Sequence, residues 1–211
     1  TTNPATMEVG LGMFKLSATD GCQNNTIQNC IFNMQRVNNA NSTAPMVEGS
    51  VGVAMMNSTA LASTTVLTVT AASGSNSNNK FYNNTINSAN YGIVLIGFAA
   101  VTPFTLADTN NEIGALGFGN SILNFGGGAA TNPSAGIRTL AQYGLNVNYN
   151  IVNNNNGTGV NHLTTLRGIY INTAVSASAN ITNNNITVIS GATTSLLEGI
   201  NNASGSTAAS N

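Results

Sequence analysis

The sequence predicts an all-β chain wound as a parallel β-helix, a solenoid of about five to six coils with two larger loop insertions. Two repeated elements predict it. One is a glycine followed by a short apolar stretch, and the other is an asparagine-rich stretch around an isoleucine. A third observation excludes helices: the apolar residues are mostly β-branched and alternate or run in threes and fours, and Gly and Asn interrupt every longer window. We expect residues 1–211 to form a single domain, a segment or stacking subunit of a larger assembly.

The repeats divide the chain into coils with two kinds of strand. The glycine element begins at Gly10, Gly49, Gly92, Gly136, Gly168 and Gly199. The asparagine-rich element occupies residues 24–31, 83–87, 120–124, 150–154 and 183–187. Two of the intervals between the elements are long, and repeat arrays place such extra residues in loops. We therefore expect insertions near residues 57–79 and 98–115.

Asparagine is expected at the corners between strands. Its side-chain amide caps turns, it tolerates left-handed backbone, and at equivalent points of stacked turns it both donates to and accepts from its neighbours. The predicted amide ladder contains Asn25, Asn84, Asn154 and Asn184. The predicted file of stacked isoleucines contains Ile27, Ile86, Ile122, Ile151 and Ile186.

Three phrases of the sequence carry a resemblance to a known family. Residues 19–30, 119–127 and 180–186 resemble the right-handed parallel β-helix repeats of the pectin-lyase-like superfamily, in the versions found in very large secreted bacterial surface and adhesin proteins. The resemblance implies a right-handed coil and an extracellular or cell-surface location. It also implies that an enzyme of this kind would use clustered acids with Ca²⁺ and an Arg or Lys base, or an Asp group. A fold by itself does not assign an activity.

The scarcity of charge excludes several partners. Only 5% of the residues are charged and the net charge is −1, so no basic face is available for nucleic acid or an anionic membrane. The longest apolar run, residues 91–101, is shorter than the roughly 20 residues that cross a bilayer, so we expect no membrane insertion.

The same scarcity argues against catalysis. The acids are Glu8, Asp20, Glu48, Asp108, Glu112 and Glu198, and no two lie within three residues of each other. We expect no catalytic residue, no metal and no cofactor. A polysaccharide lyase or hydrolase is the alternative, and it requires two acids to converge in a groove with Arg36, Lys80 or Arg138. His162, the single histidine, is expected on a surface loop.

Aligning the glycine elements predicts two contacts between neighbouring coils. Arg167 should pair with Glu198, and the Arg138 cation should lie against the Tyr170 ring. Tyr143, Tyr149 and Tyr170 are candidates for stacking against glycan rings. A disulfide between Cys22 and Cys30 requires a bend between them, and the sequence leaves it open.

The predicted function is structural. We expect a non-enzymatic extracellular β-helix that forms part of a surface adhesin, a stalk or a head-to-tail filament. Its expected partners are copies of itself or flanking repeats stacked end to end, because strand edges at the ends of a coil stack invite another chain. Glycans are a further candidate partner. The alternatives are a polysaccharide lyase or hydrolase and a carbohydrate-binding module.

Overall fold

The computed structural model describes residues 8–36, 49–127, 132–172, 174 and 177–204. In this part of the chain the only helical piece is a short 3₁₀ turn, η1 (Ala72–Gly74), and everything else is strand or loop. No helix within these ranges has the length and apolarity to cross a membrane. The all-β prediction is confirmed.

The strands form three large sheets and one small one, and all paired strands run parallel. Sheet I contains β1 (Val9–Lys15), β4 (Val51–Thr59), β7 (Tyr91–Ile96), β11 (Ser134–Leu140), β15 (Leu166–Ile171) and β18 (Leu197–Asn202). Sheet II contains β2 (Thr26–Gln28), β5 (Lys80–Tyr82), β9 (Glu112–Ile113), β13 (Leu145–Asn148) and β16 (Ala179–Thr182). Sheet III contains β3 (Ile31–Asn33), β6 (Thr85–Asn87), β10 (Ser121–Leu123), β14 (Ile151–Asn153) and β17 (Asn185–Thr187). The small sheet pairs β8 (Asp108–Thr109) with β12 (Gln142–Tyr143).

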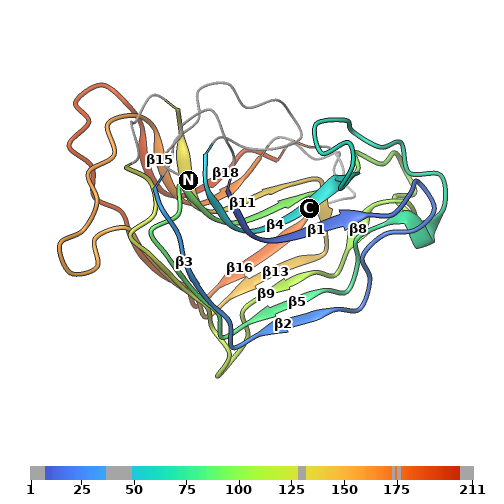
Figure 1. The fold of residues 1–211 in the computed structure, drawn as a ribbon, viewed down its shortest axis with the longest axis horizontal. Coiled ribbons are helices and arrows are strands. Elements are labelled where there is room, and N and C mark those ends of the chain that lie inside the picture. The colour runs from blue at the N-terminus through green and yellow to red at the C-terminus, as the bar shows by residue number, and fades with distance from the viewer. Residues whose placement is uncertain (1–7, 37–48, 128–131, 173, 175–176, 205–211) are drawn as a thin grey trace.

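The chain visits sheets I, II and III in turn, and we call each such passage a coil. Coil 1 is β1–β2–β3, coil 2 is β4–β5–β6, and coil 6 is represented by β18 alone. Figure 1 shows the result for sheet II, in which β2, β5, β9, β13 and β16 lie side by side. This order of stacked parallel strands is compatible with a parallel β-helix. The expectation of two strand types in each coil is wrong, because each complete coil has a further short strand, in sheet II, which a corner separates from the sheet III strand of the asparagine-rich element.

Sheets II and III each turn a file of apolar side chains inward. In sheet III the file is Phe32, Ile86, Ile122, Val152 and Ile186, and in sheet II it is Ile27, Phe81, Ile113, Val147 and Ile181. The predicted isoleucine file is therefore corrected at two positions. Ile27 belongs to sheet II, and Ile151 points outward with 44% of its surface exposed while its neighbour Val152 is fully buried. A one-residue slip reverses the face of a strand residue, and the sequence Ile151-Val152 does not reveal which of the two points inward.

A file of glycines runs along sheet I beside the inward-facing isoleucines. Its members are Gly10, Gly52, Gly92, Gly136, Gly168 and Gly199. Gly52 takes the place predicted for Gly49, which instead has a positive φ of 76° just before β4. A Cβ on Gly92 would lie 2.4 Å from the Gly136 carbonyl oxygen and 2.4 Å from Ile122 Cγ2. Glycine recurs here because sheets I and III approach too closely for any side chain.

Two long connections carry the extra residues. Residues 60–79 link β4 to β5, and residues 97–111, including β8, link β7 to β9. The predicted insertions extended too far, since residues 57–59 belong to β4 and residues 112–113 form β9 in sheet II. Glu48 lies outside the described residues.

Candidate functional sites

A buried amide ladder follows the corner between sheets II and III. Asn84, Asn120, Asn150 and Asn184 stack in successive coils, and each of the first three donates from Nδ2 to the Oδ1 of the next at 2.9–3.0 Å. The same Oδ1 atoms also accept from the backbone N–H groups of the preceding ladder residues, and each Nδ2 donates in addition to a carbonyl in the coil before. Every polar atom of the Asn120 side chain is thereby paired while the residue is fully buried.

The residue before three of the four ladder asparagines turns the chain. Asn83, Tyr149 and Asn183 have φ values of 50°, 60° and 56°, in the left-handed region. Asparagine is among the few side chains that adopt this conformation readily. The Asn-Asn doublets of the sequence are thus a turning residue followed by an inward-facing one.

A second amide ladder precedes sheet II. Asn25 Nδ2 donates to Asn79 Oδ1 at 2.9 Å, Asn79 Nδ2 donates to Asn111 Oδ1 at 3.2 Å, and Asn111 Nδ2 donates to Gln142 Oε1 at 2.7 Å. The predicted ladder therefore combined residues that lie at different corners of the coil. Asn84 and Asn184 belong to the first ladder and Asn25 to the second. Asn154 belongs to neither ladder, because its Nδ2 donates hydrogen bonds to the carbonyl oxygens of Val160 and Ile189.

A charged cluster interrupts the interior next to the second ladder. Three residues before the ladder members Asn25, Asn79 and Asn111 stand Cys22, Asn76 and Asp108, and Gln142 is the register partner of Asp108 in coil 4. Asp108 Oδ1 accepts from the Asn76 N–H at 2.8 Å, and Gln142 Nε2 lies 3.4 Å from Asp108 Oδ2. Lys15, at the end of β1, reaches in from coil 1, and its Nζ lies 3.3 Å from Asp108 Oδ1 and 2.6 Å from Gly74 O. Both charged side chains are 0% exposed.

Burial controls the protonation of this pair. It raises the pKa of Asp108 to about 6, although Lys15 and the Asn76 N–H oppose the increase. It lowers the pKa of Lys15, against the attraction of Asp108. Burial also raises the pKa of the nearby Cys22 thiol. Removal from water thus shifts both groups toward their neutral forms, since it disfavours both charges.

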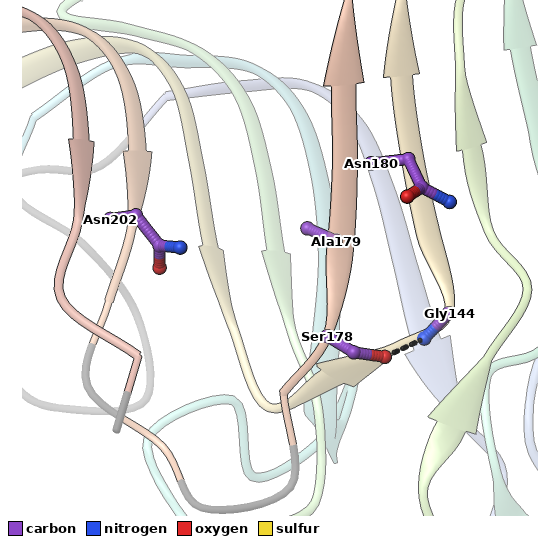
Figure 2. A pocket seen from close by; sticks show the side chains of 5 residues that line it. All are labelled: Gly144, Ser178, Ala179, Asn180 and Asn202. Carbon is purple, nitrogen blue, oxygen red and sulfur yellow. Dashed lines mark hydrogen bonds between the residues drawn. The ribbon is translucent and has the colours of Figure 1, made fainter. Parts of the chain in front are cut away.

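The last coil leaves strand edges and apolar side chains open. In the described residues β18 pairs only with β15, β16 only with β13, and β17 only with β14. Leu197 and Ile200 continue the inward-facing positions of Leu166 and Ile169, yet they are 46% and 51% exposed where the earlier pair is fully buried. A hollow of about 140 Å³ is lined by residues of β16 and β18 and of their surroundings: Gly144, Ser178, Ala179, Asn180 and Asn202. In Figure 2 Asn202 of β18 and Ala179 of β16 face each other across it, and Ser178 Oγ is joined to the Gly144 N–H.

The outer face of sheet I places the predicted cross-coil residues together. Arg167 and Glu198 are neighbours in register, and Arg167 Nε lies 2.6 Å from Glu198 Oε2. Arg138 is the register partner of Tyr170, but its guanidinium lies over Tyr91 at 5.7 Å. The Tyr170 ring is covered by Arg167 at 4.2 Å. The predicted register of Arg138 and Tyr170 is thus found, and the Tyr91 and Arg167 side chains lie on the same face beside them.

The three candidate glycan-stacking tyrosines lie apart. Tyr143 is in β12 with its ring 5.2 Å from that of Phe104, Tyr149 is at a corner between sheets II and III, and Tyr170 is on sheet I. Tyr82, another tyrosine that the sequence offers for glycan stacking, lies on the outer face of sheet II beside Phe118, with ring centroids 5.9 Å apart.

Tyr82 borders a polar groove of about 540 Å³. The groove is lined by Asn24, Thr26, Asn78, Lys80, Asn110 and Glu112. The Tyr82 hydroxyl donates to Glu112 Oε2, and Lys80 and Glu112 are register partners. Three left-handed corner asparagines thus share one surface with a lysine, an acid and an aromatic ring.

No pair of acids gathers in this groove. Glu112 is the single acid that lines it; Asp108 is buried in the interior and Glu198 is bound to Arg167. Within the described residues no three His, Cys, Asp or Glu side chains are close enough to hold a metal ion. The arrangement lacks the paired carboxyls that glycoside hydrolysis uses.

His162 and the cysteines have structural environments. The surface-loop expectation for His162 is wrong, because the residue is fully buried. Its Nδ1 accepts from the Gly127 N–H at 3.0 Å, its Nε2 lies 2.9 Å from Thr164 Oγ1, and burial lowers its pKa. Cys22 and Cys30 are free thiols. The Cys22 thiol donates a hydrogen bond to the Phe14 carbonyl, and the Cys30 thiol donates one to the Gln28 carbonyl.

The chain matches no protein-family model, and no curated protein or solved structure matches it either.

Proposed function

We propose that the chain is a non-enzymatic structural segment, a right-handed parallel β-helix whose last coil takes up a further coil. The right-handed form is supported by the general preference of crossovers between parallel strands for that hand. In this proposal the added coil comes from another copy of the chain or from flanking repeats, within an extracellular adhesin, stalk or filament.

One observation carries the proposal: within the described ranges, all three sheets end in open edges around half-exposed inward-facing residues. Each covered coil buries such residues completely, which stabilises the fold by about 1.5–3 kcal/mol for each large apolar side chain. The same gain is available when a further coil covers Leu197 and Ile200.

Gly199 supports the same reading. Earlier glycines of the file are crowded by the carbonyl of the next glycine in the file and by a sheet III side chain of their own coil, whereas a Cβ on Gly199 would meet nothing within 4 Å. Nothing in the described residues requires glycine at this position, but a following coil would require it.

Sedimentation velocity over a range of concentrations tests the proposal. We expect the chain to form oligomers that lengthen along one axis, and Ile200→Lys to abolish them by placing a charge at the open end. Leu61→Lys is the matched control, because Leu61 is fully exposed on the β4–β5 connection and should not affect association. A monodisperse monomer at every concentration contradicts the proposal.

A second candidate function, glycan binding, is favoured by the groove beside Tyr82. Aromatic rings stack on sugar faces, and neighbouring amides and charged groups bond sugar hydroxyls. A glycan array with the chain and with Tyr82→Ala tests it. We expect the variant to lose any binding that the groove provides, and Tyr149→Ala, on another corner, to retain it.

A further inference from the structure

The Lys15–Asp108 cluster differs from every other polar feature of the interior described above. The amide ladders satisfy the same kind of buried backbone groups with neutral asparagines. Asp108 accepts a backbone N–H of the preceding coil as a ladder asparagine does, so an asparagine would serve this structural role without charge. Isolated buried ion pairs stabilise proteins weakly, because desolvation offsets their attraction.

We propose that Lys15 and Asp108 form an intramolecular isopeptide bond that covalently joins coil 1 to coil 3. The geometry points to this bond. An amine and a carboxyl lie 3.3 Å apart, both are completely shielded from water, and they come from positions 93 residues apart in the sequence. The 3.3 Å distance joins Nζ to Oδ1 and holds the amine against the carboxyl group, which gives the two groups a very high effective concentration.

The reaction is a condensation that needs no other reactant. A proton passes from Nζ to the carboxylate across the contact, giving a neutral amine and a carboxylic acid. The Nζ lone pair attacks Cγ, an Nζ–Cγ bond forms, and the Cγ–OH bond breaks. The hydroxyl leaves with a proton from Nζ as water, and the product is a neutral amide.

Neighbouring groups position the reactants. Gly74 O holds Nζ at 2.6 Å, while the Asn76 N–H and Gln142 Nε2 each face one carboxyl oxygen. These two donors can stabilise negative charge that develops on the carboxyl during attack. Gln142 is itself fixed by the second ladder through Asn111 Nδ2. The directions in which burial moves the pKa values of Lys15 and Asp108 support the same neutral forms.

Mass spectrometry of the whole, reduced and denatured chain tests the bond directly. We expect an intact mass lower than that of the sequence by one water molecule. Trypsin should then fail to cleave after Lys15, and the digest should contain residues 1–36 linked to residues 81–138. The full sequence mass, or a water loss together with a free 1–15 peptide, overturns the proposal.

Variants separate this bond from other water losses. Lys15→Arg keeps the positive charge but lacks the primary amine, so we expect the full mass and no linked peptide. Asp108→Ala should give the same result. Lys80 is an internal control, because it neighbours Glu112 in register but lies exposed on the outer face, and trypsin should cleave after it in every sample. Should either variant fail to fold, the mass of the unaltered chain still decides, and the result does not depend on how the coils assemble.

Discussion

Two inward-facing files of polar side chains satisfy buried backbone hydrogen-bonding groups in different ways. Between sheets II and III, Asn84, Asn120, Asn150 and Asn184 repeat one neutral amide in every coil. In the file that precedes sheet II, Asp108 occupies an equivalent place, accepts the N–H of Asn76, and has no donor of its own. Lys15 and Gln142 supply the missing donors. The comparison teaches that the stack needs hydrogen-bond acceptors at its corners, and that a charge in such a place requires a charged partner.

The largest expected effect comes from breaking the charged file. Asp108→Ala leaves the Lys15 amine buried without its carboxyl and also prevents the proposed bond. We expect the free energy of unfolding to fall by about 3–5 kcal/mol, measured by urea unfolding. A loss below about 1 kcal/mol would show that water or another group replaces the carboxyl.

The stability of the protein should also depend on pH through buried Asp108 once the proposed bond is prevented. In Lys15→Met, Asp108 loses the cation that opposes its raised pKa, so its folded pKa lies above about 6 while its unfolded value stays near 3.8. The folded state then holds the proton to higher pH than the unfolded state. Stability should be greatest below pH ~4 and fall as pH rises through the folded pKa, by on the order of 3 kcal/mol. Lys15→Met combined with Asp108→Asn should remove this dependence from the unfolding curves.

Truncating a side chain of the neutral asparagine ladder should lower the free energy of unfolding slightly less. Asn120→Ala removes four hydrogen bonds and leaves the buried Asn84 N–H without its partner, while the Phe81 carbonyl keeps only the Gly114 N–H. We expect a loss of about 2–3 kcal/mol in chemical denaturation. Asn180→Ala, at an exposed position with one side-chain bond, should change stability by less than about 0.5 kcal/mol.

The glycine file contrasts the middle of the stack with its open end. Gly92→Ala would force a Cβ against Gly136 O and Ile122 Cγ2, so thermal unfolding should show a loss of about 1–3 kcal/mol. Gly199→Ala meets no atom in the single chain and should be near neutral there. Equal losses at both positions would mean that backbone freedom, and not crowding, explains the glycines.

The smallest effect is expected on the outer face. Arg167→Ala removes a partly exposed ion pair with Glu198 and a stacking contact with Tyr170. Pairs of this kind contribute about 0–1 kcal/mol, and added salt should reduce the contribution further. A large loss would assign the Tyr170 packing a greater role than the charge.

The local chemistry of individual repeats was predictable, whereas their alignment was less so. Arg167 and Glu198 lie side by side as the glycine spacing suggested, because Gly168 and Gly199 are true register partners. The alignment failed where two similar residues are adjacent or close, as with Ile151 and Val152 or Gly49 and Gly52. The merged asparagine ladder had the same cause, since Asn25 and Asn84 look alike in sequence but stand at different corners.

The Lys15–Asp108 cluster was beyond sequence reasoning. Its members come from coils 1 to 4, and no motif links them. Only the coordinates show that Asp108 faces the interior while Glu112, four residues later, lines an outer groove.

By itself the sequence determined the class of structure: few charges, β-branched apolar residues in short runs, and glycine and asparagine at intervals leave stacked short strands as the way to bury the apolar side chains. The tertiary structure decided which residue of each run faces inward, how many sheets a coil contains, and that one lysine and one aspartate meet inside. These outcomes depend on the register between strands far apart in the chain, and register follows from the packing of all the coils together, not from any local pattern.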